Sequence, residues 1–206
     1  MKLHLPDLKV VVFTCGVHTF RRAKICRMFA VRGFRNYQFV FGLEGGTVED
    51  YWKNLIPGML KVYRETRPPF LFLQDDVVET SFYQNDVNVP DDAQVAFLGG
   101  SDFEFRYDDR PDEWVRLHSM MCDHSVIYLD RAAQETFATS IEQHLDTPYD
   151  VSIALMFNRL RVYCLKQPYY RQCDGHNDVH TQNYYPGQCK RSMHYKLFEQ
   201  REKDAG

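Results

Sequence analysis

The sequence contains no apolar run that approaches the roughly 20 residues needed to span a membrane. Its first seven residues include charged residues and a proline and lack a signal-peptide core, and a strand-like segment follows at once. The dinucleotide fingerprint Gly-x-Gly-x-x-Gly is also missing, so a dinucleotide cofactor is not favoured. The length of 206 residues leads us to expect one domain over residues 1–206, and the missing signal leads us to expect a cytoplasmic location.

Paired cysteine motifs and a strong charge of either sign are missing as well. The six cysteines are scattered, several within apolar segments: Cys15, Cys26, Cys122, Cys164, Cys173 and Cys189. We interpret them as reduced thiols in a cytosolic protein. A net charge of −3 and a pI near 6.2 give no general nucleic-acid signature, which argues mildly against a DNA partner while leaving room for a local basic patch.

The most informative stretch that is present covers residues 69–78. An apolar run with strand composition ends in Gln74 and then in two adjacent carboxylates, Asp75 and Asp76. Its nearly continuous apolar character predicts a strand buried on both faces of a parallel sheet. Ligands bind beyond the carboxyl ends of such strands, and two neighbouring carboxylates there favour a hard divalent cation. The alternative is that the pair simply opens a loop.

This strand with its acidic end resembles the donor-binding motif of glycosyltransferase-A type nucleotide-sugar transferases, and the element order is nearest to lipopolysaccharide-type and viral or phage members. In that family an Asp-x-Asp or Glu-Asp-Asp triplet holds Mn²⁺ through the donor diphosphate. The resemblance implies that Gln74 and Asp75 contact the donor and that Asp76 binds Mn²⁺ or Mg²⁺. Gln74 takes the first acidic position, where an amide is a weaker metal ligand.

A strand at residues 9–15, a tight turn at 16–18 and a helix at 19–32 form the start of a Rossmann-like unit. Thr19 is the expected N-cap, and Gly33 ends the helix. In the resembling family this first loop lies against the nucleotide, which implies nucleoside contacts from Thr14, Cys15, Gly16 and His18. The alternative for His18 is a helix-capping or surface residue.

Arg21 and Arg22 fall in the first turn of that predicted helix. A cation is unfavourable there because the helix dipole is positive at its N-terminus. Their position indicates an anionic partner, for which the donor diphosphate is the candidate. The alternative is a solvated basic face of the helix.

A second strand at residues 37–44 and a helix from Val48 to about Thr66 continue the alternation. Pro57 with Gly58 should kink or split this helix. In the resembling family the end of the second strand often contacts the base, which implies that role for Glu44; the alternative is an exposed loop carboxylate. These elements belong to a nucleotide-binding half at about residues 8–100.

An acceptor-side half is expected at about residues 101–185, followed by a C-terminal tail at 186–206. We predict a polar loop or short helix at 79–92, strands at 94–100, 114–121, 124–129 and 161–165, an exposed loop at 101–113, and helices at 131–143 and 151–160. Asp130 is the expected N-cap of the first of these helices.

Asp150 is the candidate general base. Thr147 followed by Pro148 predicts a helix start, which puts Asp150 in the first turn. The resembling family often places its catalytic carboxylate here, which implies that Asp150 accepts the proton of an acceptor hydroxyl in an inverting mechanism. The alternative is an ordinary capping box of Thr147 and Asp150.

The segment after Lys166 is polar and contains several metal-binding side-chain types. In the resembling family a late His or Asp can return to the metal, which implies His176 or His180 here. The competing hypothesis is structural zinc, with ligands drawn from Cys173, His176, His180, Cys189 and His194. The irregular spacing of these residues argues against zinc.

The sequence and the resemblance together predict an α/β fold with a Rossmann-like, mixed but mostly parallel sheet flanked by helices. The implied reaction moves a sugar from a nucleoside-diphosphate sugar, with UDP favoured, to a hydroxyl of a glycan or, in a phage, of a modified DNA base. One alternative is a nucleotidyltransferase, which would want a phosphate loop rich in Gly and Lys or Arg after the first strand. Another is a non-catalytic binding module, which Gln74 favours.

Overall fold

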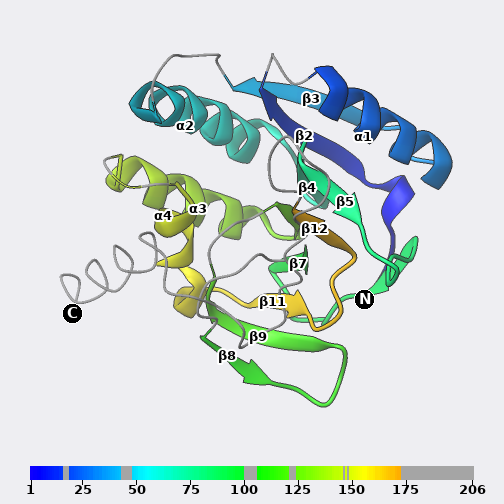
Figure 1. The fold of residues 1–206 in the computed structure, drawn as a ribbon. Helices are drawn as coiled ribbons and strands as arrows, with labels where there is room; N and C mark the ends of the chain where they lie inside the picture. Colours follow the sequence, from blue (N-terminus) through cyan, green and yellow to red (C-terminus); the bar gives the residue numbers. More distant parts are fainter. Residues whose placement is uncertain are drawn as a thin grey trace.

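A mixed eight-stranded sheet forms the centre of the computed structural model, which describes residues 1–15, 19–42, 48–99, 106–120, 124–145, 147 and 149–172. The strands are β2 (Lys9–Cys15), β3 (Tyr37–Gly42), β4 (Phe70–Gln74), β7 (Val95–Gly99), β8 (Arg106–Asp109), β9 (Trp114–Ser119), β10 (Ser125–Tyr128) and β11 (Val162–Leu165). Their order is β3-β2-β4-β10-β7-β11-β9-β8 (Figure 1). Only β10 and β9 run against the other strands of this sheet.

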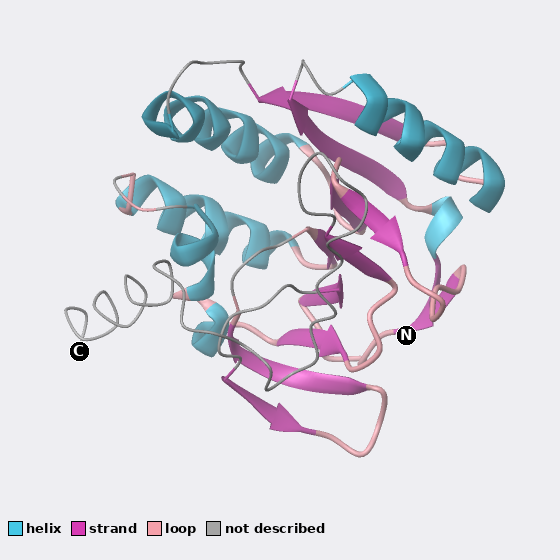
Figure 2. Ribbon diagram, in the orientation of Figure 1, coloured by secondary structure: helices cyan, strands magenta, loops and turns pink. Residues whose placement is uncertain are grey.

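Helices cover both faces of the sheet (Figure 2). They are α1 (Thr19–Arg32), α2 (Val48–Glu65), α3 (Arg131–Gln143) and α4 (Tyr149–Ala154), with single 3₁₀ turns η1 (Leu5–Asp7) and η2 (Phe157–Arg159). Helices α2, α3 and α4 share one core cluster with Val11 and Phe72, whereas α1 packs against Val10 and Val12 in a second cluster. Successive strand residues face opposite sides, so both faces must be covered. The α/β class and the doubly buried β4 are confirmed.

Two small sheets lie beside the central one. Strand β1 (Lys2–His4) pairs with β6 (Asp86–Asn88), and β5 (Val77–Glu79) pairs with β12 (Tyr170–Gln172), both antiparallel. The prediction of a polar loop or short helix at 79–92 was therefore wrong where β6 lies. The loop predicted at 101–113 likewise contains β8. The strands of the two small sheets have three residues each, and their partners lie far away in sequence, so no local pattern indicates them. Strand β8 instead forms a hairpin with β9 across residues 110–113.

Helix α2 is continuous through Pro57, so of the predicted kink or split the split is absent. The helix packs closely on β2 at this point, because a Cβ at Gly58 would lie 3.0 Å from the Phe13 ring, and Met59 is fully buried. The helix predicted at 151–160 is instead α4 followed by η2, since the chain must turn there so that the Arg161 carbonyl can accept the N–H groups of Gln94 and Val95.

Helices α1 and α3 have the predicted bounds. The Asp130 side chain accepts the N–H of Ala132 as the N-cap of α3, and Gly33 ends α1 with a φ of 85°. Thr19 is the first helical residue of α1, where an N-cap had been expected. No helix within the described ranges is long and apolar enough to cross a membrane. The two cysteine thiols that are described, Cys26 and Cys164, are free, as predicted.

Candidate functional site

The carboxyl ends of β2 and β4 bring a buried carboxylate and a hydroxyl together. Thr14, in β2, donates its Oγ1 hydrogen to Oδ2 of Asp75 over 2.5 Å. The Asp75 N–H also donates to the Phe13 carbonyl at 3.0 Å, which extends the parallel pairing of β2 and β4 by one residue. Both side chains are buried. The position of the Asp75 carboxylate is therefore fixed from its backbone and from its side chain.

A cation reaches the same carboxylate from the first turn of α1. Nη1 of Arg21 lies 3.3 Å from Oδ1 of Asp75, and this is the one contact between the two groups. Charge-assisted hydrogen bonds of this type usually measure about 2.7–2.9 Å, so this contact is long. Thr14, Arg21 and Asp75, which were predicted to serve one site, do come together, although their role in binding a donor remains a proposal.

The neighbouring predicted residues lie around this group. Asp76 forms part of the turn between β4 and β5 and is half-buried. The guanidinium of Arg22 stands over the ring of Phe41, 5.3 Å from its centroid. Phe41 pairs with Thr14 in the β2–β3 register and is 56% exposed. Sequence reasoning missed Phe41, and its only signal was an aromatic residue near the end of a strand.

The start of α4, which carries the candidate general base Asp150, is joined to β4 by a hydrogen bond. The Nε2 amide of Gln74 donates to the hydroxyl of Tyr149, the first residue of α4, over 2.9 Å. Asp150 follows in the first turn, is 6% exposed, and accepts the N–H of Val151 at 2.9 Å through Oδ1. Asp150 lies in the first turn of α4, as predicted. The Thr147 N–H, which a capping box would direct to the Asp150 carboxylate, donates to the His144 carbonyl at 3.0 Å. Tyr149 was missed, because a buried aromatic beside a capping motif resembles ordinary core.

A buried histidine lies beneath Gln74. The His124 carbonyl accepts the Gln74 N–H at 3.0 Å, and the imidazole is fully buried. Burial lowers the pKa of His124 from 6.5 to about 4, although a hydrogen bond to the Tyr170 backbone opposes the shift. His124 is consequently neutral near pH 7 and links β10 to β12.

Strand β12 crosses the end of β7 at very short range. A Cβ at Gly99 would lie only 2.0 Å from the Tyr170 carbonyl oxygen, so only glycine fits there. The β12–β5 register then pairs Gln172 with Val77, the residue after Asp76. The chain therefore returns to the acidic turn immediately before residue 173.

Several predicted residues lie outside the description. They are Gly16, His18, Glu44, His176 and His180, the side chain of Cys15, and the remaining candidate zinc ligands Cys173, Cys189 and His194. Among the described residues, no group of three or more His, Cys, Asp or Glu side chains could hold a metal ion. Mg²⁺ and Mn²⁺ are often held by one or two carboxylates plus substrate phosphates, and the pair Asp75–Asp76 fits that manner of binding.

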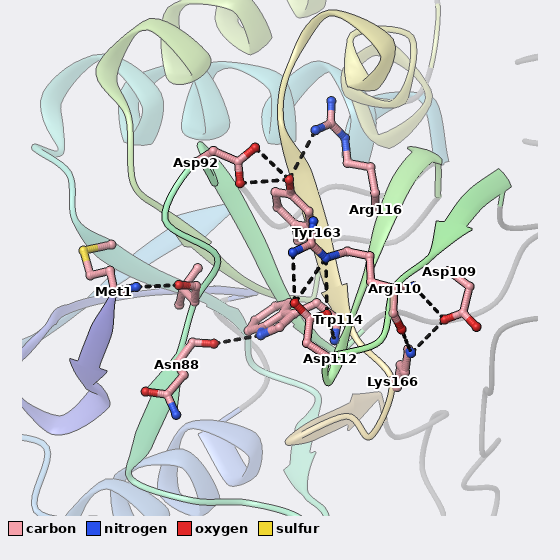
Figure 3. A network of polar contacts seen from close by, with 11 residues as sticks. Met1, Asn88, Asp92, Asp109, Arg110, Asp112, Trp114, Arg116, Tyr163 and Lys166 are labelled. Carbon is pink, nitrogen blue, oxygen red and sulfur yellow. Dashed lines mark hydrogen bonds and ion pairs between the residues drawn. The ribbon is translucent and has the colours of Figure 1, made fainter.

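A second polar network lies on the face of β9 and β11 (Figure 3). The Tyr163 hydroxyl donates to Asp92, with both carboxylate oxygens at 2.9 Å, and the guanidiniums of Arg110 and Arg116 stand 5.1 and 5.3 Å from its ring centroid. Arg110 also pairs with Asp112 at 2.9 Å. A cavity of about 420 Å³ lies between this network and the N-terminal residue. The network joins the segment before β7 to the strands β9 and β11.

Comparison with known proteins assigns no family to this chain. No protein-family model matches the sequence, and no curated protein matches it. Among the solved structures that match is the crystal structure of a nucleoside-diphosphate-sugar pyrophosphorylase from Vibrio cholerae RC9. Its TM-score is 0.46 at 8% sequence identity, and the match covers 82% of this chain and 78% of that one.

Proposed function

We propose that this protein is an enzyme that uses a nucleoside-diphosphate sugar and binds it at the carboxyl edge of β2 and β4. The observation that supports this most directly is the meeting of Thr14, Arg21 and Asp75 beside Asp76. An arginine and a hard-cation carboxylate pair at the end of parallel strands suit a diphosphate, which needs positive charge on both sides. The nucleoside would lie toward β3, with UDP favoured.

Asp76, together with Asp75, would hold Mn²⁺ or Mg²⁺, and His176 or His180 would complete the ligand set. The bound cation would offset the negative charge that develops on the leaving diphosphate. The return of the chain to Val77 through β12 supports a contribution from the residues that follow. Arg21 would bind the diphosphate from the side of α1.

We propose glycosyl transfer to a hydroxyl as the reaction. The acceptor oxygen forms a bond to the anomeric carbon while the bond from that carbon to the diphosphate oxygen breaks, and the nucleoside diphosphate leaves with the bonding electrons. Asp150 takes the hydroxyl proton as general base. The hydrogen bond from Gln74 to Tyr149 supports this role because it ties the start of α4 to the donor end of β4. The product would have inverted stereochemistry.

The acceptor would be a glycan or, in a phage setting, a modified base in DNA. Binding of duplex DNA that weakens steeply with salt would favour the second acceptor, because phosphate contacts release counterions. The free thiols of Cys26 and Cys164 suit a reducing compartment, and we place the enzyme in the cytoplasm.

Nucleotidyl transfer is the second candidate, and the position of Arg21 favours it too. A cation in the first turn of α1, at the end of β2, could equally bind the phosphates of a nucleoside triphosphate. The solved structure described above is named for a reaction of this second class, but its TM-score of 0.46 is too low for the name to be carried over. The two candidates differ in their products.

A thermal-shift screen of nucleoside diphosphates and nucleotide sugars, each with and without Mn²⁺, tests the shared donor site. We expect one nucleotide to raise the melting temperature with Mn²⁺ present, and Asp76→Ala to remove that rise. Incubation of the matching sugar donor then separates the reactions. Slow release of nucleoside diphosphate indicates glycosyl transfer, and formation of a nucleoside triphosphate from added pyrophosphate indicates nucleotidyl transfer. No shift with any nucleotide would overturn the donor site.

A further inference from the structure

We propose that Arg21 exchanges between Asp75 and the donor diphosphate, and that this exchange makes cation binding and diphosphate binding reinforce each other. The inference rests on the proposed donor site and adds that the cation and the diphosphate bind there cooperatively. In the free protein Arg21 lies on Asp75. In the loaded protein the cation takes the place of Arg21 at Asp75, and Arg21 binds the phosphates.

The two partners of Asp75 are held with unequal strength. Thr14 is 1% exposed, belongs to a central strand, and bonds Asp75 at 2.5 Å. The Arg21 side chain is 28% exposed and makes one contact with Asp75 at 3.3 Å. Thr14 therefore fixes the carboxylate in place, and Arg21 is the partner that can leave.

A second arginine of the same helix shows what a permanent ion pair looks like here. Arg32 makes three hydrogen bonds to Glu79, at 3.0, 2.9 and 2.7 Å, and its guanidinium lies 4.4 Å from the centroid of the Tyr83 ring. The hydrogen bond to Glu79 raises the pKa of Arg32. This pair uses the fork geometry of arginine fully, whereas Arg21 uses one nitrogen. The difference marks Arg21 as the exchangeable member of α1.

Charge explains why neither ligand displaces Arg21 efficiently alone. A diphosphate that draws Arg21 away leaves Asp75, which is 8% exposed, without its cation, and a buried unpaired carboxylate is costly. A cation that arrives alone must compete with Arg21 for Oδ1. When both arrive, each removes the obstacle to the other. By linkage, the factor by which one ligand strengthens the other must be the same in both directions.

Mn²⁺ alone provides the first test, through titration of the full chain with free Mn²⁺ followed by electron paramagnetic resonance. Without Arg21 to displace, Arg21→Ala should bind Mn²⁺ at least about fivefold more tightly than the wild type. Arg27→Ala, which removes the same charge from an exposed position of α1, should stay within about twofold. Equal Mn²⁺ affinity in Arg21→Ala and the wild type would sink the exchange, as would the absence of Mn²⁺ binding at millimolar concentration. Arg21→Gln replaces the alanine variant if that protein does not fold.

The second test repeats the titration with saturating uridine diphosphate. The wild type should bind Mn²⁺ at least about tenfold more tightly with the nucleotide than without it, and Arg21→Ala should lose most of that gain. An undiminished gain in Arg21→Ala overturns the exchange and leaves the donor site intact. A third outcome is that no nucleoside diphosphate binds, while Arg21→Ala still binds Mn²⁺ more tightly than the wild type. The proposed function then fails, and the competition between Mn²⁺ and Arg21 for Asp75 stands.

Discussion

The two polar networks of this protein are built in opposite ways. Around Tyr163, the hydroxyl bonds both oxygens of Asp92, two guanidiniums stand by the ring, and Arg110 has its own carboxylate partner in Asp112. Around Asp75, one short bond to Thr14 is accompanied by one long contact to Arg21. In the first network the Tyr163 hydroxyl and Arg110 each have several partners, although the buried Nε of Arg116 has no hydrogen-bond partner. In the second, Asp75 is held tightly by Thr14 and loosely by Arg21.

We use this difference, rather than residue type, to distinguish a structural network from the proposed donor site. Both networks contain arginine, aspartate and an aromatic neighbour, and a sequence motif could not tell them apart. A network whose polar groups find several partners within the protein stabilises the fold. A carboxylate at the end of parallel strands that is held on one side, with an adjacent second carboxylate, is suited to accept a ligand. The variants below probe this contrast.

The largest expected effect is the loss of the Tyr163 ring. Tyr163 is 2% exposed, so Tyr163→Ala should lower the free energy of unfolding by about 3–5 kcal/mol in urea titrations, through the cavity and the lost ring contacts. Binding of nucleotide by the folded fraction should not change. Tyr163→Phe keeps the ring and loses the bonds to Asp92, which should cost only about 1 kcal/mol. Equal losses in the two variants would contradict a structural network.

The buried imidazole of His124 should make the stability of the folded protein depend on pH. Its pKa is about 4 in the folded protein and 6.5 otherwise, so between these values the unfolded chain binds the proton that the folded chain refuses. The free energy of unfolding should therefore rise with pH from about 4 to about 6.5, by up to roughly 3 kcal/mol from this residue, and level off above. His124→Gln should remove that part of the slope. His118→Gln, a control at a partly exposed histidine of β9, should retain it. A slope unchanged in His124→Gln refutes the assignment.

Asp76→Asn should separate binding from stability. Asp76 is half-buried in a turn, so the substitution should change the free energy of unfolding by less than about 1 kcal/mol. Mn²⁺-dependent nucleotide binding should weaken at least about tenfold by calorimetry, because the cation loses a charged ligand. Glu135→Gln, on the exposed surface of α3, serves as the control and should bind as the wild type does. If Asp76→Asn binds nucleotide with Mn²⁺ as tightly as the wild type does, Asp76 is not a ligand of the cation.

The smallest effect should come from one hydroxyl. Tyr149→Phe removes the acceptor of the Gln74 amide and should cost about 1 kcal/mol. Tyr169→Phe removes a comparable bond, from the Tyr169 hydroxyl to the Asp86 carbonyl at 3.2 Å, and should cost about the same. Only Tyr149→Phe should slow transfer, because only it loosens the helix start that carries Asp150. Equal turnover in both variants would remove Tyr149 from the site.

The elements that the sequence predicted well carry their information locally. Helix α3 begins where Asp130 can cap it, and α1 ends where Gly33 adopts a positive φ. Strand β4 is recognisable because burial on both faces requires an unbroken apolar run. In each case, the residues that decide the structure lie within a few positions of one another.

The elements that were missed depend on partners far along the chain. Strands β6 and β12 exist because β1 and β5 are beside them. The bond from Gln74 to Tyr149 joins residues 75 positions apart. The end of α4 was placed too late because the need to deliver β11 to the sheet overrides the local preference for helix. The sequence predicted that Thr14, Arg21 and Asp75 serve one site. It could not predict that Thr14 lies closer to the Asp75 carboxylate than Arg21 does, because that difference appears only in the interatomic distances.

Gly99 has a consequence for the order in which the protein is made. The ribosome releases Asp75 and Asp76 well before β12, so the nascent chain can fold the β2–β4 edge while the acidic turn still lacks the strand beside it. When β12 emerges, it must pass directly over β7, and the missing side chain at residue 99 leaves room for it. A larger residue at this position would keep β12 from taking its place over the end of β7.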